Sequence, residues 1–273
     1  MKIAYLTCVY PPYPGGIGFA AQSMAQEMAK RGHEAHVFTP KASPHQSKLG
    51  AGQAGVSLHE LRPWLRFGNA AFLPQLLWKL RDFDVIHLLY PFYGAAELLP
   101  LIKKISRAKI IAHHTMDAAA AGFLGRIFAL HAQFIMPRIF NCADTAITLS
   151  EDFFIASRLA GAYQNFENAP PIEFMPHGVD TDLFRPSTEQ EIPNPKAQIP
   201  IILFVGGLDS AHYFKGVYVL LAALRILQWG GVLFRCLIVG DGNLREEYEK
   251  QARAEVAFQN SQSPTLRGYR ITI

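Results

Sequence analysis

The chain has 273 residues, of which 50% are hydrophobic and 18% charged, and its formal net charge is +4. This length allows one large domain or two smaller ones, and the composition excludes a disordered, collagen-like or coiled-coil chain. The small and scattered excess of Lys and Arg excludes nucleic acid as the expected partner. Three widely spaced cysteines, Cys8, Cys142 and Cys236, predict neither a disulfide framework nor a metal cluster and favour a reducing compartment.

The first uncharged stretch lies between Lys2 and Glu27, and its apolar start is similar to that of a signal peptide. The apolar run ends at Pro11, however, and is far shorter than the ~20 residues that a membrane-spanning helix needs. We therefore expect a buried first strand and a cytoplasmic protein, with the inner face of the membrane as a further location.

Short apolar runs then alternate with segments of helical period, which is typical of βαβ units and a parallel sheet. In the first helical segment, Ala21, Met24, Ala25 and Met28 form one apolar stripe, and Gly32 is the expected stop signal. Ser150 is the expected N-cap of a later helix. The predicted strands of the first half are Ile3–Val9, Ala35–Thr39, Val85–Leu89, Lys109–His113, Thr145–Leu149 and Ile172–Met175.

A proline-rich, polar stretch at residues 186–200 predicts a linker between a first domain, 1–185, and a second, 201–273. The second half repeats the strand, glycine turn and helix of the first, so we expect two Rossmann-like halves with a cleft between them. Its predicted elements are the strands Ile201–Val205 and Cys236–Val239, a leucine-rich helix after residue 216 and a polar helix over 244–254. Since an open sheet usually has about five strands, and no element is expected after Glu255, we interpret the second domain as incomplete and the chain as truncated.

A glycine-rich loop with Gly15, Gly16 and Gly18 joins the first strand to the first helix. Glycines let backbone N–H groups converge at a helix N-terminus, where an anion such as phosphate is favoured. The run from Gly16 also matches a relaxed dinucleotide pattern, G-x-G-x-x-A. A dinucleotide enzyme needs an acid at the end of the second strand, but Glu34 stands at its start and Thr39 at its end. A turn without a ligand is the third interpretation.

Two histidines, His113 and His114, stand where the predicted strand 109–113 ends, with Asp117 shortly after. Open α/β sheets bind ligands at this end of their strands, and a histidine can move a proton or bind a sugar hydroxyl. Adjacent residues of a strand point to opposite faces, so we do not expect the pair to share a metal. We predict a substrate role for one of them, with His114 favoured, while a core histidine bonded to the backbone is the alternative.

Three motifs follow in order: MPHGVDTDLF over residues 175–184, FVGGLD over 204–209 with FKG over 214–216, and LIVGDG over 237–242. In order and spacing they resemble the retaining glycosyltransferases of family 4, which have the GT-B fold. The resemblance runs from the glycine loop to about Ala254. It implies an α/β protein with two facing, doubly wound parallel-sheet domains, the second of them incomplete here.

The family resemblance also implies an activity: a hexose passes from a nucleotide-sugar to a hydroxyl of a polysaccharide or a lipid-linked acceptor. The first domain would hold the acceptor, and the second a UDP- or GDP-sugar, with no cofactor and no metal ion. Lys215 would grip the diphosphate, whose leaving charge a cation at a helix N-terminus stabilises. The implied catalytic residues are His114 and Lys215, and the implied substrate-binding residues are Gly15, Gly16, Gly18, His113, His177, Gly178, Gly206, Gly207, Gly216, Gly240 and Gly242.

Two departures from the family pattern weaken the expected activity. Gly207 stands where the family usually has an arginine, which removes one of two cations for the diphosphate. The glutamate pair with which the family holds the donor sugar and ribose has no counterpart. We therefore expect negligible turnover from this chain alone. A non-catalytic remnant or binding subunit and a Rossmann-type dinucleotide enzyme remain as alternatives.

The segment 123–140 is rich in Phe, Ile and Leu, and the sequence favours an ordinary helix that covers the sheet there. A peripheral membrane contact is the alternative, because basic amphipathic segments suit a lipid surface. The basic residues assigned to this contact are Lys103, Lys104, Arg107 and Lys109.

Overall fold

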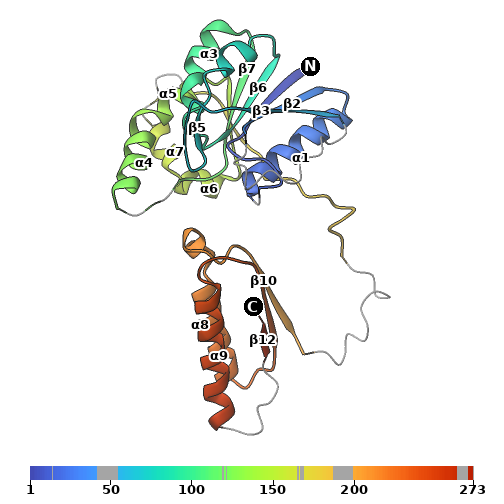
Figure 1. Ribbon diagram of the computed structural model, residues 1–273, viewed down its shortest axis with the longest axis vertical. Coiled ribbons are helices and arrows are strands. Elements are labelled where there is room, and N and C mark those ends of the chain that lie inside the picture. The colour runs from blue at the N-terminus through green and yellow to red at the C-terminus, as the bar shows by residue number, and fades with distance from the viewer. Residues whose placement is uncertain are drawn as a thin grey trace. The chain divides into compact units, whose positions relative to one another are not determined.

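The computed structural model describes residues 1–13, 15–41, 55–118, 120, 122–164, 166, 169–186, 199–262 and 270–272, with the backbone alone for residues 211, 255–262 and 270–272. The chain divides into two compact units, Met1–Phe184 and Arg185–Ile273 (Figure 1). Most of the expected linker, residues 187–198, lies outside the described residues.

Unit 1 is built on a seven-stranded sheet in the order β3-β2-β1-β6-β7-β8-β9, with every pair parallel. The strands are β1 (Lys2–Leu6), β2 (Glu34–Pro40), β3 (Val56–Leu61), β6 (Val85–Tyr90), β7 (Lys109–His114), β8 (Thr145–Thr148) and β9 (Ile172–Phe174). The chain runs outward from β1 in one direction and from β6 in the other, so the topological switch point lies between these two strands. This is the doubly wound arrangement predicted from the sequence, and ligands of such sheets bind at the switch point.

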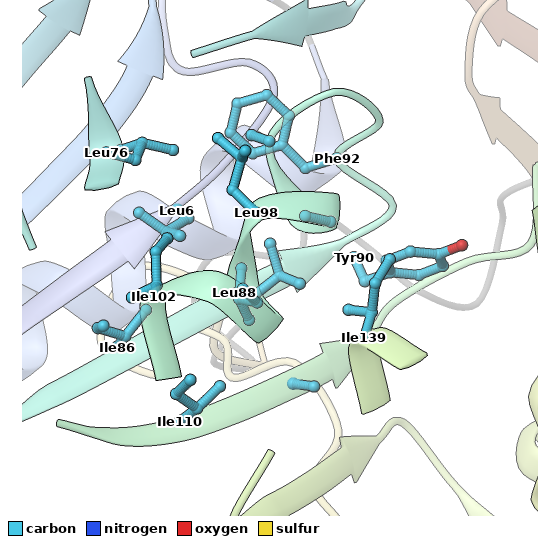
Figure 2. Packing of buried hydrophobic residues seen from close by; sticks show 14 of the residues in the cluster. Leu6, Leu76, Ile86, Leu88, Tyr90, Phe92, Leu98, Ile102, Ile110 and Ile139 are labelled. Carbon is cyan, nitrogen blue, oxygen red and sulfur yellow. The ribbon is translucent and has the colours of Figure 1, made fainter. Parts of the chain in front are cut away.

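Helices cover both faces of this sheet, which explains why its strands are nearly continuous apolar runs. On one face, α1 (Gly16–Lys30) buries Ala21 and Ala25 against Tyr5 and Leu89. On the other face, a larger core gathers around Leu88, with Leu98 and Ile102 packed over it (Figure 2). The remaining elements are the hairpin β4 (Leu65–Phe67) and β5 (Ala70–Phe72), α2 (Leu76–Lys79), η2 (Ala96–Leu98), α3 (Leu99–Ile105), α4 (Gly122–Phe134), α5 (Met136–Asn141), α6 (Glu151–Ala156) and α7 (Arg158–Tyr163).

Local signals in the sequence are confirmed at the helix ends. Gly32, which follows the C-cap residue Arg31 of α1, has φ +83°, and the Ser150 hydroxyl accepts the Phe153 N–H at 3.1 Å at the start of α6. The first strand is shorter than predicted, because the Thr7 hydroxyl donates to the Val9 carbonyl at 2.8 Å and turns the chain away from the sheet. The strands β3, β4 and β5 were not predicted.

Unit 2 has a parallel sheet in the order β10-β11-β12, formed by β10 (Ile201–Val205), β11 (Arg235–Val239) and β12 (Arg270–Thr272). The helices α8 (Val217–Trp229) and α9 (Arg245–Gln262) lie after β10 and β11, and η4 (Ser210–Lys215) precedes α8. The core side chains Phe204, Cys236, Ile238 and Tyr248 pack with α8. In the described part of unit 2, the opposite sheet face leaves Leu203 and Val205 exposed.

The expectation of no element after Glu255 is wrong. The helix α9 continues to Gln262, and β12 pairs with β11. The composition of this stretch is polar, and only pairing with a distant strand makes its end a strand. None of the helices in the described ranges is both long and apolar enough to span a bilayer.

Candidate functional site

The glycine loop lies at the carboxyl edge of the unit 1 sheet, where it joins β1 to the start of α1. Gly15 is the N-cap, in an extended conformation, and Gly16 and Gly18 lie in the first turn. A Cβ on Gly16 would meet nothing within 4 Å, whereas a Cβ on Gly18 would lie 2.9 Å from the Val9 carbonyl oxygen. Gly18 is therefore required by the packing of α1 against the chain that leaves β1, and Gly16 is the glycine open to a ligand.

His113 and His114 point to opposite faces of the sheet, as alternation along a strand demands. His113 is fully buried, and its Nδ1 lies 3.3 Å from Nε2 of His87 on the neighbouring strand β6. Burial lowers the pKa of His87 to about 4 and that of His113 to about 3, so both rings are neutral near pH 7. The Nε2 atom of His113 has no hydrogen-bond partner among the described residues. The centre of the His177 ring is 5.8 Å from that of the His113 ring, so the structure brings these two predicted site residues together.

His114 is also fully buried, but in the core on the other face, against the rings of Phe140 and Phe153. Its Nε2 lies 3.1 Å from Oδ1 of Asp117, whose other oxygen accepts the Arg158 N–H at 2.9 Å. Burial raises the pKa of Asp117, but these two hydrogen bonds and the electrostatic attraction of His114 and Arg158 together lower that pKa overall. Among the described residues, Nδ1 of His114 is unpaired. The substrate role assigned to His114 stays a prediction.

A polar chain that the sequence did not reveal lies beside His114. The Tyr90 hydroxyl is 3.3 Å from Nδ1 of His131, and the Nε2 of that ring is 2.6 Å from Glu97, which also accepts the Gly94 N–H at 2.7 Å. Burial, with neighbouring negative charge, keeps the pKa of Tyr90 well above its usual range. The three linked side chains, Tyr90, Glu97 and His131, come from β6, η2 and α4, so no local pattern in the sequence links them. Their contacts join α4 to the rest of unit 1.

In unit 2, two glycine turns meet at the carboxyl edge of the sheet. The Gly206 N–H donates to Val239 O at 3.0 Å, and the Leu208 N–H donates to Asp241 O at 2.9 Å. A Cβ on Gly240 would overlap the Gly206 carbonyl, and one on Gly242 would overlap the backbone of Leu208. These glycines are therefore required for the close approach of the two turns.

Lys215 and Gly216 follow these turns. Gly216 caps α8 in the left-handed conformation, with φ +76°, which favours glycine there. The ammonium group of Lys215 lies 5.5 Å from the centre of the Phe214 ring. Lys215 is exposed, and no described residue forms an ion pair with it. It is therefore available to an anion. Of the predicted residues in the loop after β9, His177 and Gly178 are exposed.

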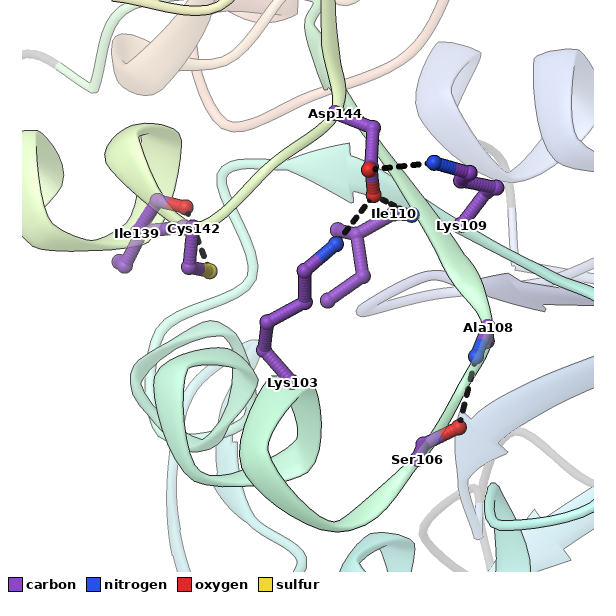
Figure 3. A network of polar contacts seen from close by, with 8 residues as sticks. All are labelled: Lys103, Ser106, Ala108, Lys109, Ile110, Ile139, Cys142 and Asp144. Atoms are coloured by element: carbon purple, nitrogen blue, oxygen red, sulfur yellow. Dashed lines mark hydrogen bonds and ion pairs between the residues drawn. The ribbon is translucent and has the colours of Figure 1, made fainter. Parts of the chain in front are cut away.

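The basic residues expected at a membrane lie at the amino edge of the sheet. Lys103 and Lys109 both contact the carboxylate of Asp144, which also accepts the Ile110 N–H at 2.8 Å (Figure 3). Burial alone would raise the pKa of Asp144, but these hydrogen bonds lower it to about 2. The carboxylate of Asp144 thus engages two of the four basic residues and links α3 and β7 to the start of β8.

The apolar segment 123–140 consists of two helices with different surroundings. The shorter one, α5, buries Met136, Ile139 and Phe140, as expected for a helix that covers the sheet. The longer one, α4, buries none of its residues and follows the carboxyl end of β7, away from the basic residues. Its exposed large apolar side chains are Phe123, Leu124, Ile127, Leu130 and Phe134. The predicted basic and apolar features therefore do not form one surface.

Comparison with known proteins gives consistent matches. The profile of glycosyltransferase family 4 matches residues 14–183. A GDP-mannose-dependent alpha-mannosyltransferase of Mycobacterium tuberculosis is 24% identical over 260 residues, which cover 89% of this chain and 63% of that protein. The O-antigen chain mannosyltransferase C of Escherichia coli is 24% identical over 251 residues, which cover 89% of this chain and 62% of that protein.

Solved structures agree on the fold. The Anabaena protein HepE, in complex with UDP and glucose, matches with a TM-score of 0.60 and 17% identity, over 99% of this chain and 68% of that one. Such a likeness shows the GT-B fold class. The chain spans somewhat less than two thirds of the length of the two curated relatives.

Proposed function

Because the chain belongs to glycosyltransferase family 4, we propose that its protein is a retaining glycosyltransferase that moves a hexose from a nucleotide-sugar to a hydroxyl group. The observation that carries this proposal is the family match over residues 14–183, which includes the glycine loop and both histidines at the carboxyl edge of unit 1. The acceptor class is a polysaccharide or a lipid-linked saccharide. Both relatives are named as mannosyltransferases, so GDP-mannose is the first donor to test.

Unit 1 supplies the acceptor side in this proposal. A neutral imidazole can accept a proton from a sugar hydroxyl or bond to it. Burial keeps His113 neutral, and its free Nε2 is the nitrogen that such a hydroxyl could pair with. Because His114 already bonds Asp117 through Nε2, only its Nδ1 is left for a substrate. Any substrate contact requires local opening, because both side chains are completely buried.

Unit 2 supplies the donor side. Breaking the bond between sugar and phosphate leaves negative charge on a nucleoside diphosphate, and a cation placed beside it stabilises that charge. Lys215 is an exposed lysine directly before the N-terminus of α8, whose dipole also favours an anion. A lysine in this position can act on the leaving group without a metal ion.

Calorimetric titration of the whole chain with GDP-mannose, UDP-glucose and NAD tests this proposal. We expect binding of a nucleotide-sugar, and Lys215→Ala should weaken it about 10-fold or more, because a hydrogen bond to a charged group contributes about 1.5–3 kcal/mol. Lys250→Ala, an exposed lysine on α9, is the matched control. Binding of NAD without binding of either nucleotide-sugar would overturn the proposal. Product formed from a bound donor and a saccharide acceptor would separate an enzyme from a binding subunit.

The dinucleotide alternative receives no support from the structure. Its ribose-binding acid should follow the carboxyl end of β2, but β2 ends at Pro40, and the nearest candidate, Glu34, lies at the opposite end. There Glu34 is 2.7 Å from Nε2 of His36 and 3.8 Å from the ammonium of Lys2. These contacts give Glu34 a structural role at the amino edge.

A peripheral membrane contact belongs to the proposal through α4 alone. This helix is 13 residues long, has no acidic residue and exposes five large apolar side chains, which suits the interface of a lipid bilayer. Sedimentation with vesicles that contain anionic lipid should capture the protein, and Phe123→Ser with Leu130→Ser should release it. Replacement of Lys104 by Ala should have little effect, because Lys104 lies at the other edge of the sheet. Equal capture of the serine variant would exclude α4 as the contact.

A further inference from the structure

We propose that His212 is the second cation of the donor site in unit 2, and that binding of the donor diphosphate therefore depends on protonation of His212. This inference rests on the proposed function, because it takes the diphosphate to bind at the glycine turns and Lys215. It adds a residue and a pH dependence that the sequence motifs did not indicate.

The first observation concerns the space beside Gly207. A Cβ built on Gly207 would lie 2.8 Å from Nδ1 and 3.0 Å from Cγ of His212. The imidazole therefore occupies the volume that a side chain at position 207 would enter. Position 207 is also the one where the resemblance implies an arginine, so the loss of one cation coincides with the placement of another ionisable group. Any larger residue at 207 would have to displace the ring of His212.

The second observation is the orientation of the ring. Nδ1 of His212 lies 2.7 Å from Oδ2 of Asp209, and the backbone N–H of His212 donates to the Asp209 carbonyl at 2.9 Å. With Nδ1–H directed to the carboxylate, Nε2 is the remaining nitrogen, on a side chain that is 45% exposed. No described residue pairs with Nε2. The turn thus fixes one nitrogen and leaves the other to solvent or ligand.

This orientation makes protonation decisive. A neutral ring bonded through Nδ1–H offers only a lone pair at Nε2, and a phosphate oxygen is likewise an acceptor, so the two cannot bond. A protonated ring offers Nε2–H as a charge-assisted donor. Protonation also changes the net charge of the pair formed by His212 and Asp209 from −1 to zero. Both effects favour a diphosphate.

His212 and Lys215 both belong to η4. The centres of the His212 and Phe214 rings are 6.0 Å apart, and the ammonium group of Lys215 lies 5.5 Å from the centre of the Phe214 ring. Asp241, on the loop packed against Gly206–Asp209, lies 3.9 Å from Arg245 at the start of α9. Burial and the carboxylates of Glu247 and Asp209 raise the pKa of the Tyr248 hydroxyl, which is therefore neutral. Asp209 is thus the carboxylate that faces His212, and Lys215 is the neighbouring cation.

Titration with GDP-mannose and UDP-glucose at about pH 6 and about pH 8 tests the inference, because imidazole changes charge in this interval. The diphosphate of these donors is esterified at both ends and keeps its charge throughout, so the ligand itself does not titrate. We expect the wild-type chain to bind these donors at least about 5-fold more tightly at pH 6 than at pH 8, as a charge-assisted hydrogen bond predicts. His212→Ala should bind equally at both pH values, at the weaker level. His33→Ala, in unit 1, should behave as the wild type.

A second variant keeps the test independent of the loss of a side chain. Gly207→Arg combined with His212→Ala puts a permanent cation into the space that the imidazole vacates. We expect this double variant to recover tight binding without dependence on pH. Donor binding that is independent of pH in the wild type, or equally dependent in His212→Ala, overturns the inference and leaves the proposed function standing. If neither the wild-type chain nor any variant binds either donor at either pH, the proposed function is overturned and the inference with it.

Discussion

Gly16 and Gly18 provide a matched pair of substitutions that separates packing from ligand binding in the glycine loop. In Gly18→Ala, the new methyl group would lie 2.9 Å from the Val9 carbonyl oxygen and 3.1 Å from the Tyr10 Cα, and both are backbone atoms that cannot rotate away. Such overpacking costs about 1–3 kcal/mol, and alanine in a helix returns at most ~1 kcal/mol. We expect Gly18→Ala to be less stable by roughly 1–2 kcal/mol. Gly16→Ala meets no atom within 4 Å and should lose nothing.

Thermal unfolding followed by circular dichroism measures this difference. For a domain the size of unit 1, each kcal/mol corresponds to about 2–4 °C in Tm, so Gly18→Ala should unfold several degrees below Gly16→Ala. Donor and acceptor binding give the second readout, because Gly16→Ala should weaken the binding of a ligand that reaches the loop while its Tm is unchanged. Equal Tm values for the two variants would refute the reasoning. In that case the backbone after β1 shifts to accommodate the methyl group, and Gly18, like Gly16, would be a residue open to a ligand.

Three further predictions concern the stability of unit 1 and are measured by urea unfolding. The pKa of Asp144 is about 2 in the folded chain and ~3.9 when unfolded, so its ion pairs stabilise unit 1 above about pH 4. The free energy of unfolding should therefore fall as the pH drops from about 5 to 2. Asp144→Asn should remove the part of this fall that the carboxylate causes. The pKa values of His87 and His113 are about 4 and about 3 when folded and ~6.5 when unfolded. Protons therefore bind the unfolded chain first, so stability should fall as the pH drops from about 7 to 4, and less steeply in His87→Phe; identical slopes would contradict the assignment. Leu88→Ala, in the core, should cost about 2–5 kcal/mol, whereas Leu65→Ala, on the exposed hairpin, should cost less than about 0.5 kcal/mol.

Several elements of the fold followed from patterns that are local in the sequence. The apolar stripe of α1, its stop at Gly32 and the cap at Ser150 depend on residues within one or two turns of each other, and the structure confirms them. The strand β12 shows the opposite case. Its residues gain a partner only when Thr272 comes to lie beside Leu237, and no local signal marks that pairing.

The candidate site divides in the same way. The glycines and the histidine pair were visible as motifs, and the order of the three motifs pointed to the family that the profile match confirms. The His87 contact with His113 and the chain from Glu97 to Tyr90 were not visible, because parallel strands bring together residues far apart in sequence. The different surroundings of Gly16 and Gly18 were also hidden, since they depend on how closely α1 approaches the turn after β1.

The sequence by itself determined that this is an α/β protein of two nucleotide-fold halves and where its glycine turns and ionisable residues stand along the chain. The tertiary structure decided which of those residues share an environment: His113 with His87 and His177 on one sheet face, His114 with Asp117 on the other, and His212 in the space beside Gly207. The physical reason is that period and turn chemistry act over a few residues, whereas burial, pKa and hydrogen-bond partners are set by atoms that only folding brings into contact.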